Sequence, residues 1–393
     1  MKISANRTNL LSAVKTALRA TCNMKDLPEL NSLLFEADAD TGIITVTGTD
    51  AQTQIQCRLR NEHVLEGGSM LIKPIVGEML RLLPEETVEI GNGFNNELEI
   101  KSGSCHYNIP YLSSKKFPRM KIPFPADFIC VKGINSIIKR TIFATDAKTQ
   151  DLHRQSLQFV KLSFANGQTT AEATNGQIAA LAQTPHASDG KMDIILHEKA
   201  LSILTSIVSP NDELYVGIAG NYAVFMKEDM FFSSRLYQGH YIEGSMLVER
   251  IKPMYRATVD AKALYDLTGN VSAIFNSGDD LCVNLCIADN CVVMRTRTAA
   301  GASQAQISAT DTVPTDINGF NYQAKWLIDC FKQTAGPLTL SFDSHGFMLI
   351  EANQSKYCIG PRGPVRIAVP EEKKEKKTRA KSTKSKAAAK AAA

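Results

Sequence analysis

The chain has 393 residues, of which 44% are hydrophobic and 21% are charged, so it can form two or three domains with sizeable cores. No apolar run approaches the roughly 18 residues that a membrane span needs. The first residues lead directly into a patterned segment rather than a signal peptide. Nine scattered cysteines without a Cys-x-x-Cys pair fit a reducing compartment. We therefore expect a cytoplasmic protein with no membrane partner.

The net charge of +4 is distributed unevenly. Residues 371–393 contain nine Lys or Arg and three Glu, so this segment carries +6 and the remainder carries −2. A slightly acidic body excludes a protein that coats nucleic acid through overall charge, so any DNA contact must come from locally arranged basic side chains. The Lys/Ala/Ser/Thr composition predicts a disordered tail. Two interpretations of it stay open: a solvated extension, or an arm that binds phosphates non-specifically.

The predicted elements repeat three times, with a period of about 125 residues. Each unit opens with an extended stretch and an amphipathic helix near Asn9, Gly133 or Lys262, and a second helix follows at residues 73–83, 198–207 or 324–332. Strands are predicted between them, for example at residues 42–48, 213–218 and 338–342, with hairpin turns at residues 166–167 and 175–176. The pattern predicts an α+β protein of three similar domains, each with two helices on antiparallel sheets, at residues 1–125, 126–253 and 254–370, followed by the tail at 371–393.

One group of cysteines needs a separate interpretation. Cys282, Cys286 and Cys291 lie in a segment that is typical of two strands joined by a polar turn. Metal binding by this cluster is the alternative to thiols buried in strands, and we expect buried thiols. No metal or other cofactor is expected.

The predicted helices place basic side chains opposite their apolar faces. A single helix of this kind is typical of an ordinary surface helix, but its recurrence in an acidic body indicates that positive charge is concentrated on one surface. If helices about 10 Å thick line a ring about 9 Å apart, six leave a hole of about 7 Å and twelve leave about 25 Å, enough for a duplex with a water layer. One chain should therefore form half of a ring that closes by head-to-tail self-association.

The sequence resembles the bacterial DNA polymerase III beta subunit family, the sliding clamps, from Met1 to about Ile367. The resemblance rests on the order and spacing of motifs at residues 1–3, 9–11, 27–30, 48–50, 116–118, 154–157, 173–176, 239–241, 319–321 and 343–344. It implies the DNA clamp fold and a non-catalytic processivity factor that encircles duplex DNA and tethers the replicative DNA polymerase. It also implies a homodimer, an ATP-dependent clamp loader, and other clamp-binding repair or replication proteins as partners. The basic residues expected to face DNA are Lys15, Arg19, Lys25, Lys73, Arg81, Lys132, Lys139, Arg140, Lys199, Lys325 and Lys332.

The resemblance further implies an apolar groove between the second and third domains that accepts a short extended peptide. Its expected residues are Leu157, Thr174, Gly176, Gln177, Ile178, Ala179, Ile242, Met246, Leu247, Gln323, Trp326, His345, Phe347, Cys358, Ile359, Pro364, Val365 and Arg366. This sequence has Thr-Asn-Gly-Gln-Ile at residues 174–178, where the family has Thr-Asp-Gly-His-Arg. Two registers are open for the strand that ends the family's chains: residues 364–367, after three extra residues, or residues 360–362.

The expected ring interface also departs from the family. Tyr107 stands at an aromatic position, with Ile274 and Phe275 as apolar partners. The acidic stretch usual on the facing edge is replaced by residues 295–303, which include Arg295 and Arg297. Self-association is still expected, with a different charge pairing.

Two other classes of function were compared with the clamp. An enzyme is disfavoured because the seven histidines occur singly and no phosphate-binding loop is present. A clamp-like regulator or decoy that binds partners without encircling DNA remains the alternative, because the groove and the interface both depart from the family. Retention on circular but not on linear DNA separates the two.

Overall fold

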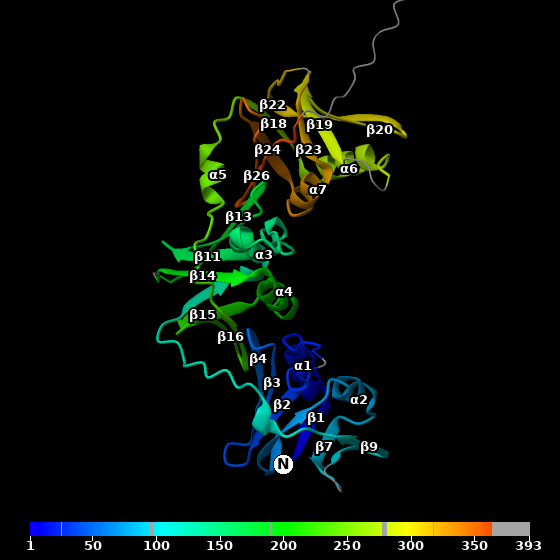
Figure 1. Ribbon diagram of the computed structural model, residues 1–393, viewed down its shortest axis with the longest axis vertical. Coiled ribbons are helices and arrows are strands. Elements are labelled where there is room, and N and C mark those ends of the chain that lie inside the picture. Colours follow the sequence, from blue (N-terminus) through cyan, green and yellow to red (C-terminus); the bar gives the residue numbers. More distant parts are fainter. Residues whose placement is uncertain (25, 94–96, 189, 277–280, 317, 364–393) are drawn as a thin grey trace, which may run out of the picture.

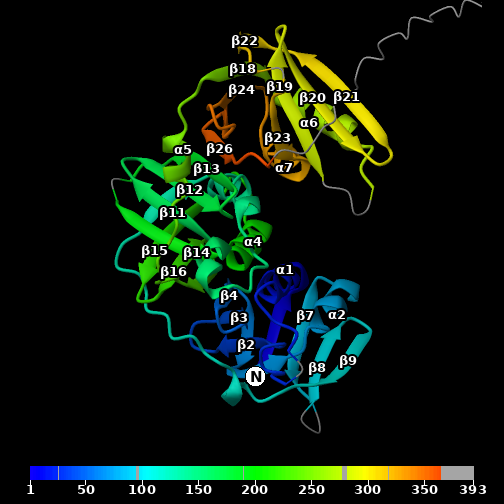
Figure 2. The same ribbon diagram turned by 45° about the horizontal axis from the view of Figure 1, so that its top comes forward.

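Three domains follow one another along an arc in the computed structural model (Figures 1 and 2). The structure describes all residues except 25, 94–96, 189, 277–280, 317 and 364–393, so the basic tail lies outside the described residues. None of the helices in the described part combines the length and apolar character that crossing a membrane requires.

The first domain comprises β1 (Lys2–Asn6), α1 (Arg7–Leu18), β2 (Leu33–Asp38), β3 (Ile43–Thr49), β4 (Thr53–Leu59), β5 (His63–Glu66), β6 (Gly68–Ile72), α2 (Val76–Leu82), β7 (Thr87–Asn92), β8 (Glu97–Ser102) and β9 (Cys105–Pro110).

The second and third domains repeat this arrangement. The second contains β10 (Ile129–Lys132), α3 (Ile134–Lys139), β11 (Phe159–Ala165), β12 (Gln168–Thr174), β13 (Ile178–Pro185), β14 (Met192–His197), α4 (Glu198–Ile207), β15 (Glu213–Ala219), β16 (Tyr222–Lys227) and β17 (Met230–Arg235). The short helix α5 (Ser245–Arg250) lies in the connection that follows. The third contains β18 (Tyr255–Asp260), α6 (Ala261–Ser272), β19 (Cys282–Ala288), β20 (Cys291–Thr298), β21 (Gly301–Ser308), β22 (Thr310–Val313), β23 (Phe320–Gln323), α7 (Ala324–Lys332), β24 (Pro337–Phe342), β25 (Met348–Ala352) and β26 (Ser355–Ile359).

All six predicted helices are present, and they pack in pairs within their domains. Helix α1 begins at Asn6, whose side chain accepts the backbone N–H groups of Thr8 and Asn9 at 3.0 and 3.1 Å. Its apolar face is buried, as the 3.6-residue period predicts: Leu10 and Val14 have no exposed surface. The α+β prediction with two helices per domain is therefore confirmed.

Two sheets run across the domain boundaries. In the eight-stranded sheet, β4 of the first domain pairs with β17 of the second, from Thr53 opposite Ser234 onward. In the nine-stranded sheet, β13 of the second domain pairs with β26 of the third, from Ile178 opposite Ile359 onward. We call these pairings the first seam and the second seam. Each seam joins two domains by backbone hydrogen bonds and protects an edge strand that would otherwise be exposed.

The cysteine segment forms the hairpin that its pattern predicted. The β19–β20 turn contains Asp289 and Asn290, both with positive φ angles, of 50° and 57°, as a two-residue hairpin turn requires. Cys282 and Cys286 are buried and Cys291 is half-buried, so these thiols are part of the packing of the third domain.

The close approach of β3 to α1 depends on Gly48. A Cβ atom at this position would overlap the carbonyl oxygen of Ala17 at the end of α1. We predict that Gly48→Ala destabilises the first domain by on the order of 3 kcal/mol, because backbone on both sides must move. Gly269→Ala on α6 is the matched control: its Cβ would meet no atom within 4 Å, and the helix should gain about 0.5–1 kcal/mol. Calorimetry should show a lower transition temperature for the first variant only.

Candidate functional site

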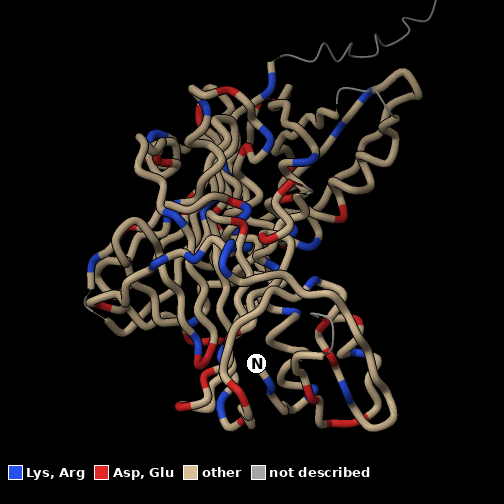
Figure 3. The backbone as a smooth tube through the Cα atoms, turned by 60° about the horizontal axis from the view of Figure 1, so that its bottom comes forward, with Lys and Arg blue, Asp and Glu red and all other residues tan. Residues whose placement is uncertain are grey.

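The helices and the connecting segments lie on opposite sides of the arc. Helices α1, α3, α4 and α7 lie on one side of the three domains, whereas α5 lies on the other (Figures 1 and 2). Lys and Arg occur on all three domains, interspersed with Asp and Glu (Figure 3). Of the cations expected to face DNA, Lys15, Arg19, Lys73, Lys139, Lys325 and Lys332 are exposed on or beside the paired helices, and Lys132 is exposed on β10.

Three other expected cations have partners within the chain. Arg81 pairs with Glu78, one turn away on α2, at 2.8 Å. Arg140, at the end of α3, reaches the third domain, where it donates to the backbone oxygen of Asn353 at 3.1 Å and to Ser355 Oγ at 3.0 Å. The Glu78 carboxylate reduces the positive charge that a ligand would meet at Arg81, whereas the neutral partners of Arg140 leave its charge in place and hold its guanidinium against the third domain.

Lys199, on α4, is the third of these cations. Its Nζ lies 2.8 Å from Asp50 Oδ2, so it joins the first and second domains. Of the expected cations, Lys25 lies outside the described residues. On α7, burial raises the pKa of Asp329, while Lys325 and Lys332 act to lower it.

The expected groove residues converge at the second seam. Ala179 and Cys358 sit opposite each other on β13 and β26, and Leu247 of α5 packs against them. The backbone N–H of Gly360 donates to the oxygen of Gln177 at 2.8 Å. Leu157, Thr174, Ile178 and Ile359 are buried, whereas Ile242, Met246 and Phe347 expose 43%, 50% and 40% of their surface. Gly176, Gln177 and His345 are exposed, and Gln323 and Trp326 are half-buried.

The segment after β26 crosses toward α7. Arg362 forms a β-bridge with Asn321, and its backbone N–H donates to the Asn321 oxygen at 2.7 Å. The Arg362 guanidinium carbon lies 5.9 Å from the centre of the Trp326 ring, within range of a cation–π contact. Residues 360–362 thus follow β26 directly into the groove region. Pro364, Val365 and Arg366, the other register, lie outside the described residues.

Of the described strands that end a sheet, two lie at opposite ends of the arc. Within the described residues, β9 ends the five-stranded sheet β5-β1-β7-β8-β9 and β21 ends the four-stranded sheet β21-β20-β19-β23, each with one strand neighbour (Figure 2). Tyr107 is half-buried on β9. Ile274 lies beside the start of β21, since its Cδ1 would be 3.3 Å from a Cβ at Gly301. Phe275 packs against the core of the third domain.

Comparisons with known proteins agree with this arrangement. The profile described as "DNA polymerase III beta subunit, N-terminal domain" matches residues 1–121. The beta sliding clamp of Halalkalibacterium halodurans is 24% identical over 350 residues, which cover 84% of this chain and 90% of that protein. The beta sliding clamp of Staphylococcus aureus is 22% identical over 346 residues, with the same coverage. The chain is thus similar to beta sliding clamps over most of its length, and its first 121 residues match the N-terminal domain of the DNA polymerase III beta subunit.

Solved structures of the family have the same fold. The DNA polymerase sliding clamp from Bacillus subtilis superposes with a TM-score of 0.84 at 20% identity, over 93% of this chain and 99% of that chain. A putative DNA polymerase III beta subunit from Eubacterium rectale gives a TM-score of 0.84 at 18% identity, over 92% and 99%. The clamp fold predicted from the resemblance is confirmed.

The sequence did not predict what holds α5 on the second domain. Lys161, only 15% exposed, lies 2.7 Å from Glu243, 3.6 Å from Asp193 and 3.9 Å from Glu172. Glu172 Oε2 accepts the backbone N–H of Ser245, the first residue of α5, at 3.1 Å. This cluster fixes the connection that carries Ile242, Met246 and Leu247. The signal that could have revealed it is the pair of opposite charges Lys161 and Glu172, which lie opposite each other on two strands joined by the predicted hairpin turn at residues 166–167.

Burial raises the pKa of Glu172 above its ordinary value. The Ser245 N–H and Lys161 act to lower it, and the Glu243 carboxylate raises it further. The Lys161 pKa is lowered by burial and raised more strongly by its three acidic neighbours. The buried hydroxyl of Tyr241 also belongs to this region, since it donates to the Glu172 backbone oxygen at 2.9 Å.

As the pH falls, a carboxyl group whose pKa is raised in the folded state is protonated in the folded protein before it is protonated in the unfolded chain. The stability cost of keeping Glu172 ionised is therefore relieved as pH falls through its folded pKa toward 4.5. We predict that the melting temperature of Glu172→Gln, measured relative to the unmodified protein, declines between pH 7.5 and 5. Glu351→Gln, at an exposed carboxylate paired with Lys356, is the control. A constant difference for Glu172→Gln across this range would contradict the assignment.

Proposed function

We propose that this chain is a DNA sliding clamp: two copies close head to tail into a ring around duplex DNA and hold the replicative DNA polymerase on its template. The observation that carries the proposal is the combination of paired helices on one side of the arc with free sheet edges at its two ends. A linear molecule with complementary ends closes into a ring when the rotation between copies permits it. The relatives named beta sliding clamp support the same role.

Ring closure is proposed to join β9 of one copy to β21 of the next. Pairing of the two strands would satisfy their free backbone groups and extend a sheet across the junction. Tyr107 would then meet the apolar side chains Ile274 and Phe275. Arg295 lies on β20, one strand in from the edge, while Glu97 lies on β8, also one strand in. Opposite charges at these positions would favour the correct alignment of the two copies.

In the proposed mechanism, the polymerase stays near its template because the clamp tethers it, rather than through high affinity for DNA. A peptide segment of the polymerase would bind the second-seam groove, and the closed ring would hold the enzyme at a high effective concentration near its template. The helix-borne cations would approach the phosphates without reading bases, so sliding continues. We propose that an ATP-dependent clamp loader opens the ring, and that other replication and repair proteins share the groove. None of these steps requires catalysis by this chain.

Encirclement can be tested topologically. Protein assembled on a nicked circular duplex should remain bound through gel filtration and should leave after one restriction cut, because a ring slides off an open end. Ile274→Asp places a charge at the proposed junction and should abolish retention on the nicked circle. Leu65→Asp, at a 61% exposed residue of β5, is the matched control and should behave as the unmodified protein. Equal loss from circular and linear DNA would support the regulator alternative instead.

The cations can be tested by their salt dependence. We predict that replacing Lys15 and Lys139 with Gln weakens binding to a short linear duplex. The slope of log affinity against log salt should become shallower by up to about 0.9 for each phosphate that the variant no longer neutralises. The control variant replaces Arg250 and Lys252, exposed residues at and just beyond the end of α5 on the other side of the arc. Fluorescence anisotropy between 50 and 200 mM salt measures both slopes. The same slope for both variants would exclude these helices from the DNA-facing surface.

A further inference from the structure

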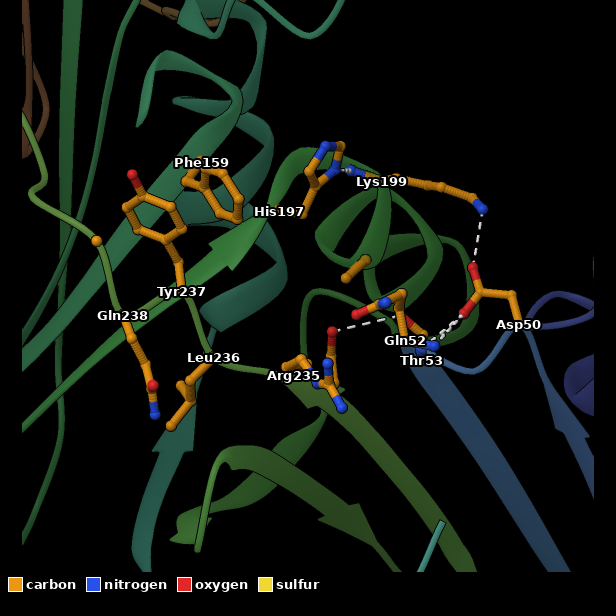
Figure 4. A pocket seen from close by; sticks show the side chains of 13 residues that line it. Asp50, Gln52, Thr53, Phe159, His197, Lys199, Arg235, Leu236, Tyr237 and Gln238 are labelled. Atoms are coloured by element: carbon orange, nitrogen blue, oxygen red, sulfur yellow. Dashed lines mark hydrogen bonds and ion pairs between the residues drawn. The ribbon is translucent and has the colours of Figure 1, made fainter. Parts of the chain in front are cut away.

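A hollow of about 420 Å³ opens at the first seam, away from the expected groove (Figure 4). Phe159 and Tyr237 form a wall, with their rings stacked at a centroid distance of 4.1 Å. The His197 ring meets Phe159 edge-on at 5.2 Å, and Leu236 extends the apolar surface. The remaining lining residues are Asp50, Gln52, Thr53, Lys199, Ala200, Ser234, Arg235, Gln238 and Gly239.

The turn at this hollow repeats the turn at the second seam. Thr49 Oγ1 donates to the oxygen of Thr53 at 2.8 Å, and Thr174 Oγ1 donates to the oxygen of Ile178 at 2.8 Å. Asp50 Oδ1 accepts the backbone N–H groups two and three residues ahead at 3.0 and 2.7 Å, and Asn175 Oδ1 accepts the corresponding groups at 3.0 and 2.9 Å. The two turns are therefore equivalent, hydrogen bond by hydrogen bond.

The neighbouring strands and helices are also equivalent. Arg235 N–H donates to the oxygen of Gln52 at 3.0 Å, as Gly360 N–H donates to the oxygen of Gln177 at 2.8 Å. Helix α4 begins beside the first seam as α7 begins beside the second. The hollow therefore occupies, between the first and second domains, the place that the expected partner groove occupies between the second and third.

The chemistry of the first seam differs from that of the second. Arg235 is exposed at the rim, while Lys199 is held by Asp50 at 2.8 Å. Burial lowers the pKa of His197, whose Nδ1 accepts the N–H of Lys199 at 3.0 Å, so the imidazole is neutral at pH 7. Among the lining residues, Arg235 and Lys199 are positively charged and Asp50 is negatively charged, so the hollow has one net positive charge beside its aromatic wall. This combination favours a ligand with an apolar side chain next to a negative charge.

We propose that the first seam is a second peptide-binding groove, which takes an extended segment carrying an aromatic or branched aliphatic side chain followed by a side-chain carboxylate. The apolar side chain lies against Phe159 and Leu236, and the carboxylate pairs with Arg235. This inference rests on the proposed function for the premise that the second seam binds peptides. The chain's own tail does not fit, because residues 371–393 carry +6. A clamp with two unlike grooves per chain can hold two kinds of partner at once.

The test uses the full chain and a fluorescein-labelled, C-terminally amidated peptide, Ser-Gly-Leu-Phe-Glu-Asp. Trp326, the single tryptophan, lies at the second seam, so its emission reports binding there and not at the first seam. Binding that leaves Trp326 emission unchanged is the first-seam component. We expect Arg235→Glu to weaken this component at least tenfold. Arg256→Glu, at another exposed arginine, should leave this component intact. A peptide with Gln-Asn in place of Glu-Asp should lose it.

Two results would overturn the proposal. One is equal peptide affinity for the unmodified protein and Arg235→Glu. The other is a peptide signal that always accompanies a change in Trp326 emission, which would assign all binding to the second seam. Arg235→Glu should still be retained on nicked circular DNA, since it changes neither free edge. Failure of the unmodified protein to be retained there would count against the proposed function, whereas loss of peptide selectivity alone counts against the second groove.

Discussion

Backbone pairing across the domain boundaries is the constraint on which the rest of this structure depends. β4 and β17, and β13 and β26, would each be an exposed edge strand if the domains stood apart. Joining them converts three small domains into one continuous arc with fixed angles between its parts. Because each seam is made in the same way, the paired helices of successive domains are presented on the same side. Among the described strands that end a sheet, β9 and β21 lie at the ends of the arc.

At the first seam, strand pairing also leaves a hollow. The strand that ends at each seam is followed by a tight turn. One short polar side chain stabilises each turn by accepting two backbone N–H groups: Asp50 at the first seam and Asn175 at the second. The following helix starts beside it, which leaves a recess between the turn, the helix and the incoming strand. The fold therefore provides the recess, and local side chains determine what it can bind. Phe159, Tyr237 and Arg235 line the hollow at the first seam, whereas Arg362 lies over the ring of Trp326 at the second.

Periodicity in the sequence predicted the elements, but not every contact between them. The six paired helices follow from apolar residues spaced at 3.6 residues, and the β19–β20 hairpin follows from its polar turn. The helix α5 was missed because it has only six residues and none of them is buried, so no periodic pattern exists to detect. Arg140 and Lys199 resembled any other exposed helix cation, because their partners lie 213 and 149 positions away in the sequence. Spacing in the sequence does not predict such contacts, which form only when strand pairing at the seams brings the domains together.

The distribution of charge determines how a ring of this kind could hold DNA without stopping on it. Exposed cations separated from phosphates by a water layer interact through salt-screened attraction that decays over about 8 Å at physiological ionic strength. Attraction of that range does not distinguish one phosphate from the next, so it opposes dissociation more than translation. Arg81 and Lys199 are already paired with carboxylates within the chain, which lowers the positive potential further. Retention must then come from closure of the ring, and the stability of the β9–β21 junction, rather than affinity for DNA, would set how long the protein stays bound.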